Sequence, residues 1–162
     1  MIEINITQTM IDRAIDKSIE MGKLNNSITR GEGNIAGFLG EEIANTIIQG
    51  DSKNTYDYDI VKDNITYDVK TKRCTSKPKP EYDCSVAAFN IKQKCDRYVF
   101  VRIENRGEIW SRAWVLGWIE KDEYFKQSRF LKKGDFDPSN NYFVKADCYN
   151  LTINQLKSFS KE

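Results

Sequence analysis

The stretch 56-YDYDIVKDNITYDVKTKR-73 decides the fold, because its pattern predicts two short strands around a tight turn. Tyr56–Val61 and Ile65–Lys70 are rich in Tyr, Ile, Val and Thr, the residue types that favour strands. Between them, Asp63 and Asn64 tolerate the left-handed backbone angles of a two-residue hairpin turn. The sequence therefore predicts a hairpin whose register follows from counting outward from this turn.

That register places several charged side chains close together. It pairs Ile60 with Tyr67 and Asp59 with Asp68, and strand alternation puts Asp68 and Lys70 on the same face. Directly opposed carboxylates repel each other, which is a cost that a purely structural hairpin would avoid. A divalent cation would remove the repulsion, and Mg²⁺ typically takes one or two carboxylates while it keeps several waters. The spacing leaves open a solvated hairpin in which Lys70 neutralises one Asp, and a register shifted by one residue.

The order of these residues resembles the active site of the PD-(D/E)XK nuclease superfamily. That motif consists of an Asp, a gap, and then Asp or Glu, any residue and Lys. Asp59, Asp68 and Lys70 match it in order, although Tyr58 stands where the motif carries Pro. The N-terminal pattern and the overall size are similar to those of small phage-encoded members of the superfamily.

Segments on both sides extend the resemblance to about residues 33–103. GNIAGFLGEE (33–42) resembles the first helix of many members, and KCDRYVFVRI (94–103) resembles the following core strand. The resemblance implies an α/β fold with a restriction-endonuclease-like core, in which α-helices flank a mixed central β-sheet. It also implies a DNA nuclease that leaves 5′-phosphate and 3′-hydroxyl ends.

The resemblance assigns roles to five residues. Asp59, Asp68 and the carbonyl of Val69 would hold Mg²⁺, for which Mn²⁺ would substitute. Glu41 would complete a first or second metal site. The metal would activate a water, since coordination lowers the pKa of water toward neutrality. Lys70 would orient or deprotonate that water and would offset negative charge on the phosphate.

Two of the catalytic candidates rest on weaker signals. In the family, the Glu directly after a helical Gly such as Gly40 points to the metal, which favours Glu41, with Glu42 as the alternate. Many members also place a polar residue, often Gln, where Gln93 stands, to orient the attacking water or to contact the scissile phosphate. A solvent-facing Glu and a surface Gln are the alternatives that the sequence leaves open.

The charge of the chain is uneven along the sequence. The net charge is +1, but Lys70 to Arg97 contains eight basic and three acidic residues, which leaves −4 for the remainder. A local basic region beside an acidic site suits a phosphodiester substrate, so DNA is the expected partner. A solvated lysine-rich loop is the alternative. The candidate DNA-binding residues are Lys72, Arg73, Lys77, Lys79, Asn90, Lys92 and Lys94.

Composition narrows the class of protein. With 162 residues, 40% of them hydrophobic, the chain is long enough for one domain with a sizeable core. The absence of histidine excludes His-dependent triads and histidine-metal nucleases. We expect neither a membrane span nor a signal peptide. We also expect the cysteines to be free thiols and the protein to be cytoplasmic, in the host cytoplasm if the gene is phage-borne. The single domain, 1–162, would comprise an N-terminal helix and loop (1–32), the catalytic core (33–104) and C-terminal strands and helices (105–162).

Hydrophobic periodicity predicts the remaining elements. Gly37 and Gly40 would let the second helix approach the sheet closely. Residues 71–81 would form a loop, because two prolines interrupt any ladder. The predicted helices span Thr7 to about Lys23, Asn34 to about Gln49, 121–130 and 152–159. Beyond the hairpin, the predicted strands span 82–88, 97–104, 108–116 and 142–147, with a short helical segment at 88–94.

Two other functions stay open. A structure-selective relative, such as a Holliday-junction resolvase, would require a homodimer. A nuclease-like fold without activity would bind DNA or a protein partner, for instance as a counter-defence factor. The intact Asp59, Asp68 and Lys70 argue against the second alternative, because a binding module does not need repelling carboxylates. We therefore expect a metal-dependent deoxyribonuclease of low sequence specificity, acting in phage DNA metabolism.

Overall fold

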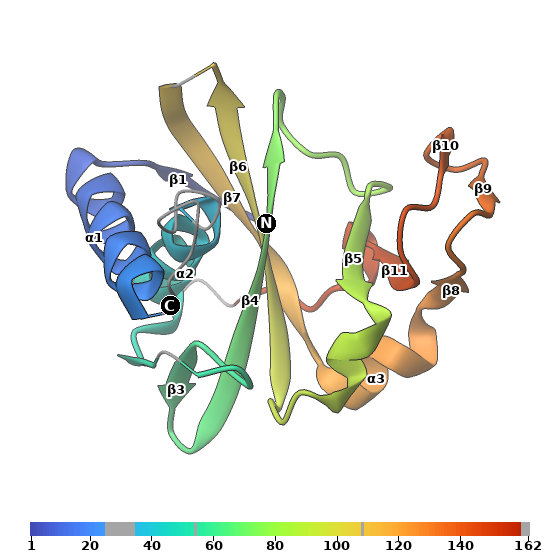
Figure 1. Cartoon of the computed structure of the whole chain (residues 1–162), viewed down its shortest axis with the longest axis horizontal. Coiled ribbons are helices and arrows are strands. Elements are labelled where there is room, and N and C mark those ends of the chain that lie inside the picture. The colour runs from blue at the N-terminus through green and yellow to red at the C-terminus, as the bar shows by residue number, and fades with distance from the viewer. Residues whose placement is uncertain (25–34, 54, 108, 160–162) are drawn as a thin grey trace.

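The chain is built around a six-stranded mixed sheet with the strand order β1-β7-β6-β4-β3-β2 (Figure 1). The computed structural model describes residues 1–24, 35–53, 55–107 and 109–159. Strands β4 and β6 run parallel, and the other neighbours pair antiparallel. The prediction of a mixed α/β fold is confirmed. The six strands are β1 (Ile2–Asn5), β2 (Asp51–Ser52), β3 (Ile60–Lys62), β4 (Ile65–Cys74), β6 (Arg97–Arg106) and β7 (Ile109–Glu120).

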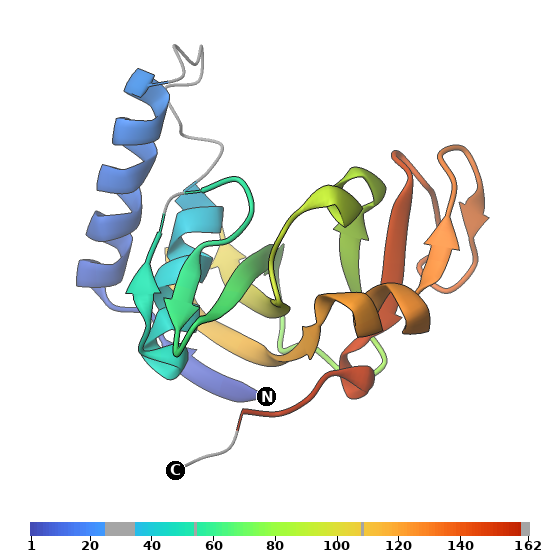
Figure 2. The ribbon, with the colours of Figure 1, turned by 90° about the horizontal axis from the view of Figure 1, so that it is seen from below.

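Two helices cover one face of this sheet (Figures 1 and 2). They are α1 (Gln8–Leu24) and α2 (Ile35–Ile48). Helix α2 packs on β4 and β6, where Leu39 and Ile43 are fully buried against Val99 of β6, and α1 packs on α2. The predicted first helix is confirmed with its cap, because the Met10 N–H donates to the Thr7 hydroxyl at 3.3 Å. The predicted cap of the second helix, Asn34, lies outside the described residues.

The other face packs against a smaller sheet of order β5-β11-β8 and against α3 (Figure 2). Edge-to-face and stacked rings fill this second core, with Tyr98 and Phe100 of β6 each within 5.6 Å of the ring of Tyr124 in α3. The remaining elements are β5 (Asp83–Ala87), the 3₁₀-helix η2 (Ala88–Lys92), α3 (Lys121–Gln127), β8 (Arg129–Leu131), β9 (Phe136–Asp137), β10 (Tyr142–Phe143), β11 (Cys148–Thr152) and the 3₁₀-helix η3 (Ile153–Gln155).

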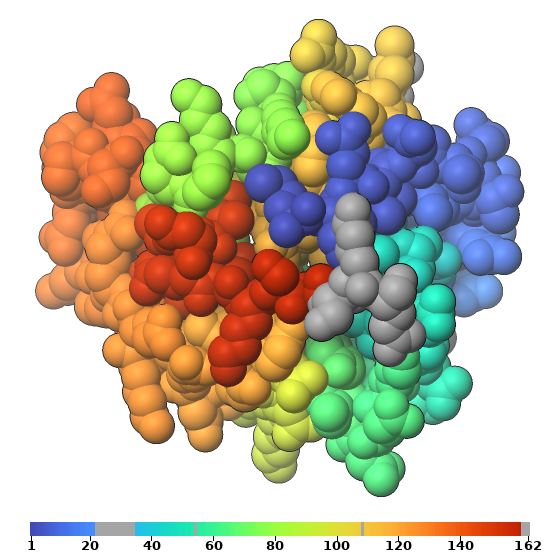
Figure 3. All heavy atoms as spheres, turned by 180° about the vertical axis from the view of Figure 1, so that it is seen from behind, coloured from blue at the N-terminus to red at the C-terminus, as the bar shows by residue number. Residues whose placement is uncertain are grey.

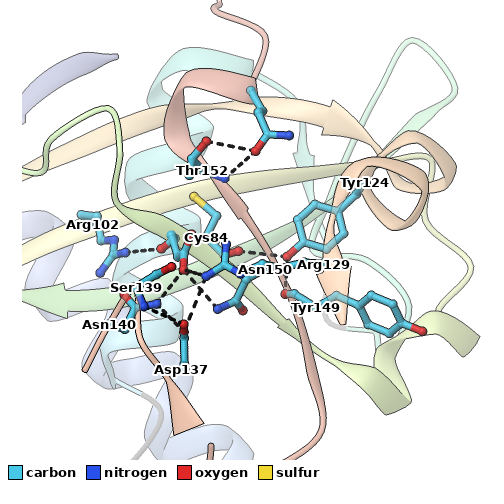
Figure 4. Close-up of polar contacts among 12 residues, drawn as sticks. Cys84, Arg102, Tyr124, Arg129, Asp137, Ser139, Asn140, Tyr149, Asn150 and Thr152 are labelled. Atoms are coloured by element: carbon cyan, nitrogen blue, oxygen red, sulfur yellow. Dashed lines mark hydrogen bonds and ion pairs between the residues drawn. The ribbon is translucent and has the colours of Figure 1, made fainter. Parts of the chain in front are cut away.

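A buried polar network around Asp83 holds the small sheet together (Figure 4). The Asp83 carboxylate accepts two hydrogen bonds from Arg129, at 3.1 and 2.5 Å, and one from Asn140 at 2.7 Å. Burial alone would raise the pKa of Asp83, but these hydrogen bonds outweigh burial and lower it. The Asp83 charge is therefore fully engaged by partners within its own sheet and the adjoining loop.

The central hairpin forms as predicted. Asp63 and Asn64 have φ of 51° and 62°, and Ile60 pairs with Tyr67. The first strand is shorter than expected, since β3 begins at Ile60, and Asp59 precedes the ladder. The hairpin register is therefore confirmed, but Asp59 is not in a strand.

Several predicted boundaries are wrong. The loop expected from Thr71 begins only after Cys74, because β4 continues beside β6 to that residue. The helix expected at 121–130 ends at Gln127, because the next residues pair with β11 as β8. Strands β1 and β11 were not predicted, and the predicted strand at 142–147 shrinks to the two residues of β10.

The final predicted helix, 152–159, is also wrong. Thr152 ends β11, a single 3₁₀ turn follows, and the backbone of Lys157 then bridges to Trp118 of β7. These last residues lie beside the N-terminal strand on the rear of the molecule (Figure 3). Among the described residues, no helix has the length and apolar character that crossing a membrane requires.

The two glycines of α2 give opposite predictions. A Cβ on Gly40 would lie 1.8 Å from the Thr71 hydroxyl of β4, so this glycine permits the predicted close approach to the sheet. A Cβ on Gly37 would meet nothing within 4 Å. We expect Gly40→Ala to lower the free energy of unfolding by about 1–3 kcal/mol through overpacking. Gly37→Ala should raise it by about 1 kcal/mol, because Ala favours the helix.

Urea unfolding of both variants measures the contrast. A shared sign of the two changes would show that helix propensity, not the contact with Thr71, dominates at these positions.

Candidate active site

The structure brings together all five predicted catalytic residues from separate segments. Glu41 comes from α2, Asp59 precedes β3, Asp68 and Lys70 share one face of β4, and Gln93 follows η2. Asp68 and Gln93 are buried, with 5% and 4% of their surface exposed. The site therefore lies on the face of β4 opposite α2, beside the segment that leads from the small sheet, and Glu41 approaches it from α2.

Asp68, Lys70 and Gln93 form one connected polar group. The Lys70 ammonium lies 2.6 Å from Asp68 Oδ2 without the alignment of a hydrogen bond, so this contact is an ion pair. Lys70 also donates to Gln93 Oε1 at 3.2 Å. The Gln93 amide donates to Asp68 Oδ1 at 3.0 Å and to the Tyr56 carbonyl at 2.9 Å. Gln93 thus holds both Asp68 and Lys70 in place.

Asp59 reaches the same place through the backbone of β4. Its Oδ2 accepts a hydrogen bond from the Val69 N–H at 2.7 Å, and its own N–H donates to the Tyr67 carbonyl at 2.8 Å. Counting from the turn predicted that Asp59 pairs with Asp68 in the ladder, and this pairing does not form. Asp59 is instead anchored next to Asp68 by these two hydrogen bonds. The assignment of the Val69 carbonyl as a metal ligand stays a prediction.

The two adjacent glutamates of α2 face different surroundings. Glu42 turns toward α1, where it lies 3.0 Å from Lys17 and 3.7 Å from Arg13. Glu41 lies 3.9 Å from Lys17 and close enough to Asp59 and Asp68 for their charges to raise its pKa. The geometry therefore favours Glu41 over Glu42 as the helix residue of the site.

The three carboxyl groups share an environment that disfavours their charged forms. Burial first, and then the charge of Asp59, raises the pKa of Glu41 to about 8. Burial and the charge of Asp68 raise the pKa of Asp59 to about 7. The pKa of Asp68 is also raised, by burial, although Lys70 opposes that shift. The site thus contains more carboxyl groups than Lys70 and the more distant Lys17 can neutralise.

This donor set suits a hard cation. In the described part of the chain, no three His, Cys, Asp or Glu side chains are arranged as a ready metal site. Mg²⁺ needs only one or two carboxylates, because it keeps several waters and takes further oxygens from substrate. Asp59 and Asp68 could supply these carboxylates, and a bound cation would relieve the repulsion that they and Glu41 share.

The predicted DNA-binding residues are spread over both ends of β4 (Figure 1). Lys92 and Lys94 are exposed around the end of η2, on the Gln93 side, and Asn90 is half-buried in η2. Lys77 and Lys79 are exposed on the loop that follows β4, at its opposite end. These residues lie at the two ends of one face and do not form a single patch.

The two basic residues within β4 lie on opposite faces. Lys72 shares the face of Asp68 and Lys70, because side chains alternate along a strand. Arg73 points to the other face, where its guanidinium lies 5.2 Å from the ring centroid of Trp110. The structure therefore separates Arg73 from the site.

Two supporting residues escaped the sequence analysis. The ring centroid of Tyr98 lies 5.5 Å from the Lys70 ammonium, and the Lys121 ammonium donates to the Gln93 carbonyl. Tyr98 belongs to the predicted buried strand, where an aromatic residue indicates only core packing. Its closeness to Lys70 depends on the parallel pairing of β4 with β6, which no local pattern reveals.

Comparison of the chain with protein-family models, with curated proteins and with solved structures found no match.

Glu41 provides a test of the crowded charge. Its ionised form is disfavoured in the folded protein, so Glu41→Gln should raise the free energy of unfolding of the metal-free protein by about 1–2 kcal/mol. The pKa rises from an ordinary value near 4.5 to about 8 on folding. The gain should therefore be absent below pH 4.5, grow as the pH rises, and level off above pH 8.

Urea unfolding in EDTA between pH 4 and pH 9 measures this profile. Glu42→Gln is the matched control, because it removes the adjacent charge from a carboxylate that has Lys17 and Arg13 as partners. An equal gain in both variants would contradict a specific charge cluster at Glu41.

Proposed function

We propose that the protein is a metal-dependent deoxyribonuclease with a restriction-endonuclease-like core. The observation that carries this proposal is the convergence of three pKa-raised carboxyl groups with Lys70 and Gln93 in one buried network. Such clustering destabilises a fold, so a function is its most direct explanation. The order of a helix, a hairpin and a crossover to a parallel neighbour, β6, also supports this type of core.

Asp59 and Asp68 would hold Mg²⁺, with Glu41 completing the set. When bound, the metal would supply an activated water and would neutralise charge on the phosphate. The carboxylates would lose their mutual repulsion, and Lys70 would no longer be needed to balance Asp68 alone. Asp59, Asp68 and Lys70 would thus exchange their present partners for the metal and the substrate.

Lys70 and Gln93 have distinct roles in this proposal. An ammonium has three donors, and Lys70 donates one to Gln93 Oε1 while it forms an ion pair with Asp68, which leaves a donor for a phosphate oxygen or for the attacking water. Both N–H groups of the Gln93 amide are engaged, by Asp68 and by the Tyr56 carbonyl. Gln93 therefore acts by positioning Lys70, and a direct contact with water would require it to give up one of these bonds.

Cleavage of supercoiled plasmid tests the proposal. We expect the purified protein to nick or linearise plasmid with Mg²⁺ or Mn²⁺ and not with EDTA. Lys70→Ala should lower the rate at least about 100-fold, since it removes the cation that stabilises the developing charge. Asp68→Asn should abolish cleavage and keep DNA binding.

Lys126→Ala is the control, because it removes an exposed lysine of α3 outside the site. Linear duplex and single-stranded DNA extend the assay to other substrates. If none of the three DNAs is cut with either metal, the protein is a binding module and the nuclease proposal fails.

A further inference from the structure

A cavity of about 260 Å³ opens between β4 of the large sheet and β5 of the small sheet. Lys70 lines one end of it, so the cavity adjoins the candidate active site. Lys72 and Arg102 also line it, from β4 and β6. At about 30 Å³ for each water, the cavity has room for several waters or for a phosphate group.

Lys72 and Arg102 stand directly opposite each other. They are register partners in the parallel β4–β6 ladder, so their side chains leave the sheet on the same face. Arg102 is buried, with 7% of its surface exposed, whereas Lys72 is exposed at the mouth of the cavity. Burial and the charge of Arg102 lower the pKa of Lys72, which fits two cations forced together.

No carboxylate among the described residues pairs with either cation. Arg102 donates one hydrogen bond, to the backbone carbonyl of Asp83 at 2.6 Å, and that bond ties β6 to β5. The Asp83 carboxylate is engaged by Arg129, and the nearby Glu104 by Arg112. A guanidinium has five donors, so this structural bond accounts for only part of what Arg102 offers.

A buried guanidinium that has no carboxylate partner and faces a second cation is costly, which makes this site a receptor for an anion. We propose that Lys72 and Arg102 form a phosphate-binding subsite that holds a backbone phosphate of the DNA strand, next to the phosphate cleaved at Asp68 and Lys70. Two residues along a strand span about 6.6 Å, a distance within reach of one nucleotide of backbone. The position on the strand rests on the proposed nuclease function, whereas phosphate binding itself does not.

The first experiment tests the chemistry of the subsite. Thermal unfolding in inorganic phosphate is compared with unfolding in sodium chloride of equal ionic strength. Phosphate should raise the Tm of the wild type and of Lys132→Met, an exposed control lysine, and should leave the Tm of Lys72→Met nearly unchanged. Because Lys72 sits at the rim and Arg102 ties two sheets, the lysine variant avoids the risk of misfolding. Equal phosphate shifts in the two variants, or none in the wild type, overturn the subsite.

The second experiment tests whether the phosphate belongs to DNA. A fluorescent single-stranded oligonucleotide in EDTA should bind Lys72→Met about tenfold more weakly than Lys132→Met. The slope of log K against log salt should also become less steep by about one unit, which corresponds to the loss of one phosphate contact. If Lys72→Met loses the phosphate effect and still binds the oligonucleotide as tightly as the control, the site serves a free phosphate compound and the proposal is overturned.

The two proposals fail separately in these assays. If phosphate has no effect on the Tm and Lys72→Met still cleaves plasmid with an unchanged KM, the subsite proposal is rejected. The nuclease proposal then stands. Absence of cleavage in the wild type, together with phosphate and oligonucleotide binding that depend on Lys72, removes the nuclease and leaves a phosphate-binding groove.

Discussion

The ion pair between Lys70 and Asp68 is the contact around which the site is arranged. Asp68 is almost fully buried, and its charge would be difficult to keep there without a cation at 2.6 Å. Gln93 fixes both partners, and its own carbonyl is held by Lys121 of α3. The segment that leads from the small sheet is thereby fastened to β4 of the large sheet. The same contacts of Gln93 therefore position the candidate catalytic residues and join the two sheets.

The two faces of the large sheet have different tasks. The face under α2 is an apolar core, in which Gly40 allows the helix to come close enough for Glu41 to reach the edge of the site. The opposite face carries Asp68, Lys70 and Lys72 along β4. It is only partly closed by the small sheet, whose own charges are neutralised within the Asp83 network. This division leaves a polar groove beside a packed interior.

Stability and function oppose each other at this site. Three carboxyl groups with raised pKa values, and two facing cations in the adjoining cavity, each make the folded state less favourable. The surrounding aromatic and aliphatic cores supply the stability that tolerates them. In the proposed function, a phosphate group with a divalent cation would complement both sets of charges, so one ligand chemistry would account for the acidic and the basic half of the groove.

Local sequence patterns determined the hairpin, the first two helices, the buried strand β6 and the face shared by Asp68 and Lys70. Each follows from turn chemistry or from periodicity within a few residues. Only the tertiary structure decided that β4 runs on to Cys74, that Asp59 leaves the ladder, and that β11 replaces a predicted helix. Those features depend on pairing between distant segments, as does the opposition of Lys72 and Arg102. Such pairing has no signature in the sequence because each strand alone satisfies its pattern equally well with several neighbours.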